Sequence, residues 1–255
     1  MVTFSFRKFL RGVESHYATC ETYRDHGWIE QRSGSGGPDD KVWKVLFQTE
    51  FDRTGLFRFE WRDQRDVFSK HFPNPENVVW ANKYGAFGRF DFEENTHHFL
   101  DLAQALDAAC NNSSGVAPMV AAMLYPELRK VFQRPTCRHR PSRVELLERD
   151  RREILSVEWQ STRDGIMLSR QVLFDVHDFT VREICEKASK LPAEQVSKDS
   201  SEPEFYQGVL GQYLSTAGSG WRGATDHGDD VVSSTKILFA GVSMAPITQA
   251  LLRPT

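Results

Sequence analysis

Residues 55–62 alternate between apolar and polar side chains with a period of two. In this stretch, GLFRFEWR, the side chains of Phe57, Phe59 and Trp61 fall on one side and charged side chains fall on the other. Such alternation is typical of a β-strand with one apolar face and one solvated face. No catalytic signature accompanies it, so this apolar face is the strongest clue to function, and it favours a protein that binds an apolar ligand.

Similar patterns recur along the chain and indicate an antiparallel β protein with helices. Apolar residues at helical spacing predict an amphipathic helix over residues 6–17, and two more helices at 99–110 and 116–124. Alternating stretches predict strands at 22–31, 42–51, 55–62, 77–81, 84–92, 154–159, 172–176 and 179–185.

The order of these elements predicts the fold class. Strands do not alternate regularly with helices, which argues against a parallel α/β sheet. We therefore predict an α+β fold: a curved antiparallel sheet, or half-open β-barrel, with helices covering its concave face. Residues 1–190 form the predicted domain. Residues 191–255 form a loop-rich C-terminal extension, with an apolar stretch at 231–252 that adds a last strand or helix.

Composition limits the partners of the chain. The 255 residues are 40% hydrophobic, which is enough for a buried core, and the net charge is −3. No overall positive field exists to attract nucleic acid. Residues 1–20 do not read as a secretory signal, because Arg7, Lys8 and Arg11 interrupt them. No run of eighteen apolar residues occurs, so no membrane-spanning helix is expected.

Four catalytic or metal-binding patterns are incomplete. Cys137 and His139 supply two zinc ligands where four are usual. His16 and Cys20 share a helix face, but no third group orients the histidine as a base. Ser243, in GVSMA, has no histidine after it. The glycine-rich match at 218–223 lacks the strand and helix of a dinucleotide site. We therefore predict neither an enzyme, a cofactor nor a metal site.

Two further features leave alternatives open. The cysteines at 20, 110, 137 and 185 are scattered, which fits reduced thiols or one disulfide. A basic cluster could meet lipid phosphates or an acidic partner, or form a solvated loop; it comprises Arg129, Lys130, Arg134, Arg138, His139, Arg140 and Arg143.

Several segments resemble the bacterial lipoprotein-carrier group with the LolA/LolB-like fold. The passage YATCETYRDHG at 17–27 resembles its opening helix-to-strand passage, and FRFEW at 57–61 and VWAN at 79–82 resemble its central hairpins. The SSG at 113–115, followed by an apolar helix, resembles its helical lid, and residues 172–183 resemble a later hairpin.

The resemblance implies a half-open barrel, closed by helices, that carries lipid without performing chemistry. It implies a lipid, or the acyl chain of a lipoprotein, as ligand, a membrane-associated protein partner and a periplasmic location. The predicted lining of the apolar cavity comprises Phe47, Phe57, Phe59, Trp61 and Trp80 from the strands, with Leu102, Leu106, Met119 and Met123 from the helices.

Two other readings of the same pattern stay open at this point. The aromatic residues can simply fill an ordinary core, and the protein is then an interaction module that binds a partner through its exposed loops. A small-molecule enzyme using the same cavity requires convergent polar groups, and the sequence indicates none.

Overall fold

A computed structural model of the chain describes residues 5–34, 41–63, 77–90, 95–110, 113–132, 135, 140–163, 166–190 and 232–246. Its helices are α1 (Phe6–Thr19), α3 (Leu102–Cys110) and α4 (Val116–Leu124), with a 3-10 helix, η1, at Pro126–Lys130. Its strands are β1 (Cys20–Gly34), β2 (Lys41–Asp52), β3 (Phe57–Asp63), β4 (Asn77–Asn82), β5 (Gly85–Arg89), β6 (His97–Phe99), β7 (Arg143–Arg149), β8 (Arg152–Arg163), β9 (Ile166–Asp175), β10 (Val181–Lys190) and β11 (Val232–Pro246).

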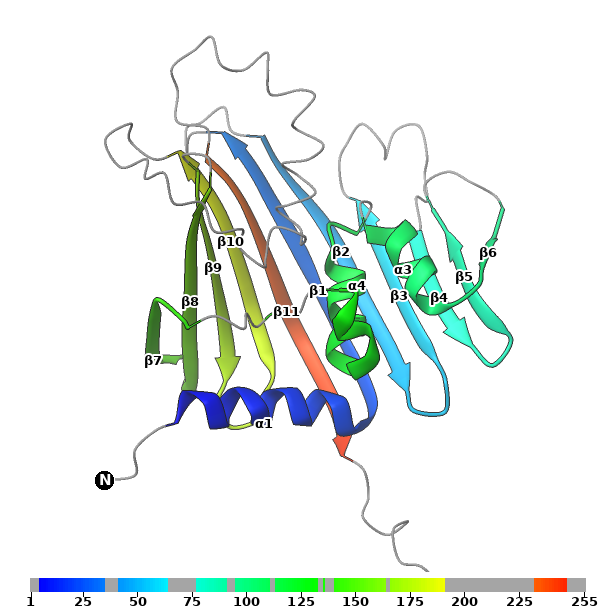
Figure 1. Cartoon of the computed structure of the whole chain (residues 1–255), viewed down its shortest axis with the longest axis horizontal. Helices are drawn as coiled ribbons and strands as arrows, with labels where there is room; N and C mark the ends of the chain where they lie inside the picture. Colours follow the sequence, from blue (N-terminus) through cyan, green and yellow to red (C-terminus); the bar gives the residue numbers. More distant parts are fainter. Residues whose placement is uncertain are drawn as a thin grey trace, which may run out of the picture.

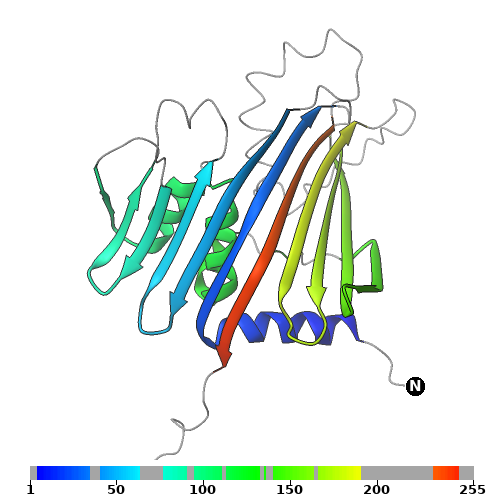
Figure 2. The same ribbon diagram turned by 180° about the vertical axis from the view of Figure 1, so that it is seen from behind.

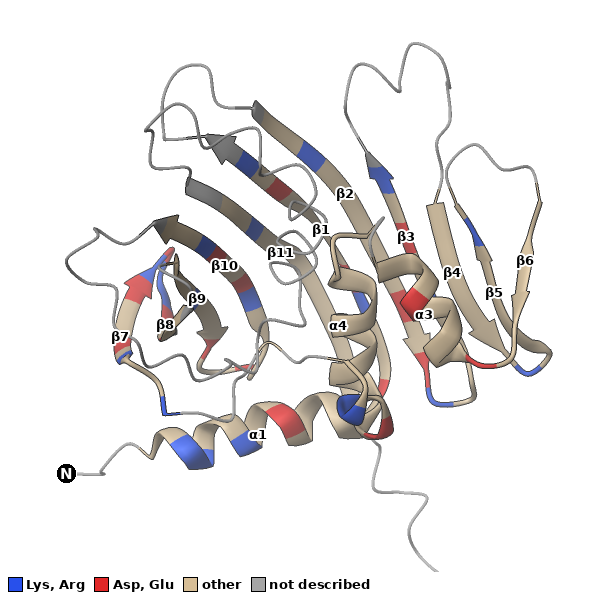
Figure 3. Cartoon of the chain, turned by 45° about the horizontal axis from the view of Figure 1, so that its top comes forward, with Lys and Arg blue, Asp and Glu red and all other residues tan. Residues whose placement is uncertain are grey.

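The strands form one antiparallel sheet in the order β6-β5-β4-β3-β2-β1-β11-β10-β9-β8-β7. The two edge strands, β6 and β7, do not pair with each other, so the sheet is not closed into a barrel. The predicted α+β class with an open antiparallel sheet is therefore confirmed. Figure 3 shows the sheet as a curved surface, with β7 to β10 following an arc above α1.

The three α-helices that the structure describes lie on the same face of the sheet. Figure 1 shows α1 crossing one end of β8 to β11, α4 running in front of β1 and β2, and α3 lying in front of β3 and β4. In the reverse view of Figure 2, these helices lie behind the sheet, and no described helix covers the face toward the viewer. We call the face toward α4 the inner face and the opposite one the outer face.

The strand register determines which side chains meet on the inner face. Phe47 of β2 pairs with Trp61 of β3, and Phe51 pairs with Phe57. Directly paired residues of antiparallel strands point to the same side, so these aromatic side chains share the inner face. Their burial, with Phe57 fully buried, confirms the alternation predicted for these strands.

Three segments differ from the sequence prediction. Phe99, predicted to begin a helix, instead ends the short strand β6, and the helix begins at Leu102. The charged segment Arg143–Arg149 forms the edge strand β7. Residues 232–246 belong to the stretch expected to add a last strand or helix to a C-terminal extension. They do form a strand, β11, but it lies between β1 and β10 in the middle of the sheet.

Candidate functional site

An aromatic cluster forms the centre of the inner face. The ring centroids of Phe47 and Phe59 lie 5.7 Å apart in a stacked arrangement, and Phe239 of β11 meets Phe47 edge-on at 5.5 Å. Trp61 continues the cluster at 5.8 Å from Phe59. Offset and edge-to-face pairs are the arrangements that aromatic rings prefer, so these four residues form a continuous apolar surface, which we call the inner wall.

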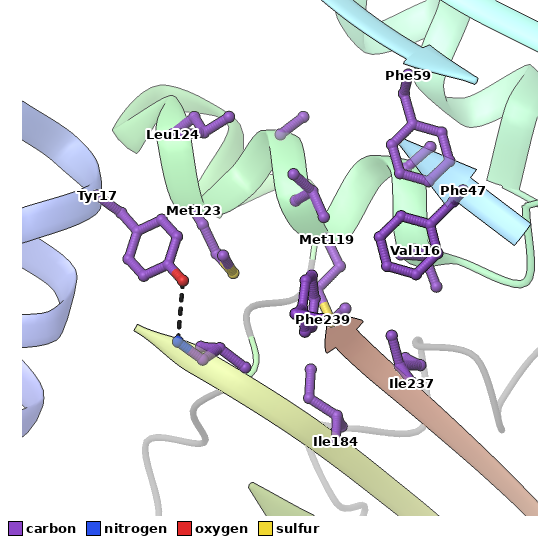
Figure 4. Packing of buried hydrophobic residues seen from close by; sticks show 14 of the residues in the cluster. Tyr17, Phe47, Phe59, Val116, Met119, Met123, Leu124, Ile184, Ile237 and Phe239 are labelled. Carbon is purple, nitrogen blue, oxygen red and sulfur yellow. Dashed lines mark hydrogen bonds between the residues drawn. The ribbon is translucent and has the colours of Figure 1, made fainter. Parts of the chain in front are cut away.

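Helix α4 covers this wall with an entirely apolar sequence. All nine of its residues are buried, and Figure 3 shows it without a charged side chain, in contrast to α1. Figure 4 shows Met119 beside Phe239 and Phe47, while Met123 lies nearer to Tyr17 of α1. Methionine side chains are unbranched and flexible, so they adapt to irregular apolar surfaces. Helix α4 thus packs its apolar side chains directly against the inner wall.

Polar contacts hold both ends of α4. Gln31 of β1 donates its side-chain amide to the Ser114 hydroxyl at 3.0 Å, just before the helix begins. At the other end, the Arg129 guanidinium donates to the carbonyl oxygens of Ala122 and Met123, both at 3.1 Å. A cation is favourable at the last carbonyls of a helix. Arg129 also donates to the Glu14 carbonyl at 3.2 Å and so joins α4 to α1.

The inner face is closed at one end by α1. The Val181 backbone N–H donates to the Tyr17 hydroxyl oxygen at 2.9 Å, a contact drawn in Figure 4. Burial raises the pKa of the Tyr17 hydroxyl, so the phenol stays neutral in the core. A small apolar cavity of about 20 Å³ remains where Val13, Tyr17, Met123, Phe174 and Val181 meet. That volume is about the size needed for one water molecule, so side chains nearly fill this part of the interior.

A polar row crosses the inner face above the aromatic cluster, on the side away from α1. The register aligns Trp43, Gln31, Thr235, Glu186, Arg170 and Trp159 on six neighbouring strands.

Within this row, Arg170 and Glu186 form a buried ion pair. The Arg170 Nε donates to Glu186 Oε1 at 2.6 Å, and both side chains are at most 4% exposed. The second carboxylate oxygen of Glu186 has no hydrogen-bond partner among the described residues. A buried charge pair in an apolar surface is costly unless well compensated. The inner face therefore combines an apolar surface with a polar boundary.

A second buried carboxyl lies below the wall on β1. Asp25 is 4% exposed, shares the inner face with Thr49 of β2 and accepts a hydrogen bond from the Tyr23 hydroxyl. Burial raises the pKa of the Asp25 carboxyl to about 7, and the contributions of Tyr23 and Thr49 offset this only in part. The sequence analysis did not identify Asp25, Arg170 or Glu186.

The residues predicted to line a cavity take different places. Most belong to the packed core of the inner face; these are Phe47, Phe57, Phe59, Trp61, Leu106, Met119 and Met123. Leu102 is half-buried at the margin of this core. Trp80 is an exception, because it pairs with Arg58 and so lies on the outer face, stacked on Phe87 at 5.3 Å. The structure thus removes Trp80 from the inner wall.

The other sequence candidates do not form reactive sites in the described part of the chain. Burial raises the pKa of the Cys20 thiol, the opposite of what a nucleophile next to His16 requires. Cys20 and Cys185 are free thiols. Ser243 is exposed on β11 opposite Arg24. Cys137, His139 and residues 218–223 lie outside the described residues.

The basic cluster is only partly described, and Arg129 has the structural role given above. Its neighbours Arg134, Arg138 and His139 lie outside the described residues. Over the ranges that the structure describes, no group of three or more His, Cys, Asp or Glu residues could hold a metal ion. None of the described helices is long and apolar enough to cross a membrane.

Comparison with known proteins gives structural likenesses alone. No family model and no curated protein matches the chain. Solved structures that it resembles include a domain of a putative outer membrane lipoprotein-sorting protein from Vibrio parahaemolyticus, with 6% identity, a TM-score of 0.34, and coverage of 96% of this chain and 94% of the other. Another is a LolA superfamily protein from Nitrosomonas europaea, with 6% identity, a TM-score of 0.30 and 99% of each chain covered. At this level the likeness carries no information about which residues of this chain bind a ligand.

Proposed function

We propose that the protein binds and carries a lipidic or acylated ligand on its inner wall, without catalysis, and that α4 moves aside to admit it. The observation that supports this most directly is the pairing of a wholly apolar helix with an aromatic wall. All nine residues of α4 are buried, and Met119 lies beside Phe47 and Phe239 of the wall. An acyl chain that replaced α4 would meet the same apolar surface that the helix covers now.

The energies of this exchange are compatible with reversible carriage. Each methylene removed from water contributes about 0.8 kcal/mol, so a chain of a dozen contributes roughly 10 kcal/mol. Association costs several kcal/mol, and displacing α4 from the wall costs more. The ligand can shift α4 only by the difference between its affinities for the open and closed states. An affinity that is useful yet reversible follows from this balance.

The polar contacts at the ends of α4 determine how easily it opens. Movement must break the contact of Ser114 with Gln31 or that of Arg129 with the Glu14 carbonyl of α1. A hydrogen bond to a charged group contributes about 1.5–3 kcal/mol. Weakening these ties would favour the open state and strengthen ligand binding, provided that α4 is a lid.

The experiment compares Arg129→Gln with Lys130→Gln, which removes a charge from the neighbouring exposed residue. Binding of an apolar fluorescent probe is titrated, together with its displacement by a long-chain fatty acid. We expect the wild type to bind the probe and Arg129→Gln to bind it several-fold more tightly, since about 1.4 kcal/mol corresponds to tenfold. Lys130→Gln should match the wild type. Loss of stability in Arg129→Gln without any probe binding would contradict carriage.

A second function is favoured by the dense packing of the same region. The cavity of about 20 Å³ is far too small for an acyl chain, and the wall is filled by the chain's own residues. In this alternative the protein is an interaction module that binds a partner protein and no small ligand. This alternative predicts that no variant binds the probe and that mass spectrometry finds no lipid in the purified protein. Carriage predicts that the probe binds and that lipid co-purifies.

A further inference from the structure

The outer face of the sheet contains a hollow, and Phe47 and Trp61 of the inner wall are among the residues that line it. It has a volume of about 360 Å³ and lies over β1 to β5. The side chains that surround it alternate with the buried aromatic residues: Leu46 and Gln48 flank Phe47 on β2, and Glu60 lies between Phe59 and Trp61 on β3. The hollow therefore opens on the outer face. Figure 2 shows that no described helix covers this face.

Two apolar residues contribute to the surface of the hollow. Leu46 is 38% exposed, and Val78 is only 4% exposed although it lies on the uncovered face. Val78 pairs with Glu60 on one side and with Arg89 on the other. Longer side chains thus rise on both sides of Val78, and this arrangement gives the hollow depth and an apolar base.

Charged side chains form the rim. Arg58, Arg62 and Arg89 contribute three guanidinium groups, and Glu60 contributes one carboxylate. The Glu60 carboxylate is held by Arg58 and by the Gln48 amide. Guanidinium groups therefore outnumber carboxylates among the described side chains that line the hollow. Guanidinium groups match the geometry of carboxylates and phosphates, to which they can donate two parallel hydrogen bonds.

We propose that this hollow binds a small amphipathic anion, with its carboxylate or phosphate at the arginine rim and its apolar part against Leu46 and Val78. The volume lies within the range of about 300–1,000 Å³ typical of ligand pockets, which combine apolar surface with a few placed polar groups. The site lies across the sheet from the inner wall, so it does not depend on movement of α4.

The first experiment titrates the purified full chain with octyl phosphate and octanoate by calorimetry. Inorganic phosphate and octanol serve as separate probes of the two halves of the ligand. We expect saturable binding of the two amphipathic anions and much weaker binding of octanol and inorganic phosphate, because each of these uses half of the site. Absence of saturable binding by both anions would overturn the proposal.

Variants then assign binding to the hollow. Combined Arg62→Gln and Arg89→Gln should weaken octyl phosphate binding by about tenfold or more, because charge-assisted hydrogen bonds are lost. Arg24→Gln, on the same face but outside the hollow, is the matched control and should bind as the wild type does. Leu46→Trp keeps every charge but fills the hollow, and it should also weaken binding. Equal affinity in all four proteins would overturn the proposal, with folding checked by circular dichroism.

Two further arms identify the source of the anion and separate this site from the inner wall. A lipid headgroup is indicated if the wild type sediments with phosphatidylglycerol vesicles but not with phosphatidylcholine vesicles, and if the combined Arg62→Gln and Arg89→Gln variant does not sediment with either. Octyl phosphate binding without vesicle binding indicates a soluble ligand. The Arg129→Gln variant should leave octyl phosphate affinity unchanged, so failure of lipid carriage and failure of this site are distinguishable. If Arg129→Gln weakened octyl phosphate binding as much as the combined Arg62→Gln and Arg89→Gln variant does, the proposal of an outer site would be overturned.

Discussion

The Tyr23 hydroxyl donates a hydrogen bond to the Asp25 carboxylate within the core, from a position two residues away on the same strand. Both side chains lie on the inner face, and neither has more than 4% of its surface exposed. The Tyr17 ring lies 5.7 Å from that of Tyr23 and connects this pair to α1. An ionisable group is thus placed where burial, not a charged partner, dominates its protonation.

The first prediction concerns the pH dependence of folding. The Asp25 carboxyl has a pKa of about 7 in the folded protein, against an ordinary value of 3.8. The folded state therefore binds more protons between these values, so its free energy of unfolding is highest below about pH 4 and falls as pH rises through 7. About three pKa units correspond to up to about 4 kcal/mol. Urea denaturation from pH 4 to 8 measures this fall.

The Asp25→Asn variant tests whether the Asp25 carboxyl causes this pH dependence. The amide cannot ionise, so the unfolding free energy of this variant should vary much less between pH 4 and 8. Burial raises the pKa of Asp175 and Glu183, but hydrogen bonds from Arg152 and Lys236, among others, leave both pKa values lowered. Their stabilising effect is lost only as the pH falls below about 4.5, at the acidic end of this window, so it does not contribute to a fall in stability toward pH 8. An unchanged pH slope in Asp25→Asn would contradict the assignment.

The second prediction concerns Gly27, at a bulge in the pairing of β1 with β11. A Cβ on Gly27 would lie 1.9 Å from the Leu238 carbonyl oxygen and 2.8 Å from the Phe47 ring. Neither β11, in the middle of the sheet, nor the packed Phe47 ring can move freely. Gly27→Ala should therefore lower the free energy of unfolding by more than about 3 kcal/mol. Chemical denaturation measures it.

Gly241→Ala is the matched control at the same bulge. Its Cβ would lie 2.3 Å from the imidazole Cε1 of His26, but that side chain is exposed and can rotate away. The substitution should therefore cost much less than Gly27→Ala. Similar costs for the two variants would show that the backbone of β11 yields at this point.

Sequence alone predicts well the elements whose evidence is local. The alternation on β2 and β3 places Phe47, Phe59 and Trp61 on one face, because a period of two is a property of the strand itself. The apolar α4 is likewise evident from its composition. Trp80 was placed on the wrong face because it belongs to another strand, and a shift of one residue reverses the face of every side chain. Residues 64–76, which precede β4, are also too many for the two-residue hairpin loop that would determine the register from the sequence.

Long-range pairing explains the remaining differences. Residues 232–246 lie far along the chain from both neighbours of β11, and nothing in their own pattern identifies a central strand. Arg170 and Glu186 did have a local signal, since they share strand parity with Val172 and Ile184, which are apolar and buried. The sequence can therefore predict that a charged side chain lies on the inner face, but it does not predict which residue of the neighbouring strand pairs with it.

The third prediction compares the two faces at neighbouring strands. Phe59 is fully buried on the inner wall, whereas Trp80 is half-buried on the outer face and contacts Phe87. Phe59→Ala should cost about 3–5 kcal/mol, and Trp80→Ala should cost well under that despite its larger side chain. Urea denaturation of both variants gives the comparison. A greater loss for Trp80→Ala would place the main core on the outer face.

The fourth prediction concerns the buried pair of Arg170 and Glu186. Glu186→Gln removes the carboxylate that lies 2.6 Å from the buried Arg170 guanidinium, which should cost about 3–5 kcal/mol. Replacing both residues, by Arg170→Met with Glu186→Leu, should recover most of that loss, because the pair gains little over apolar side chains of similar volume. The double-mutant cycle is measured by urea denaturation. The exposed pair of Arg143 and Glu145 is the control, and Glu145→Gln should cost less than about 1 kcal/mol. If the double variant were as unstable as Glu186→Gln, the pair would be needed for its geometry in the polar row and not merely for mutual neutralisation.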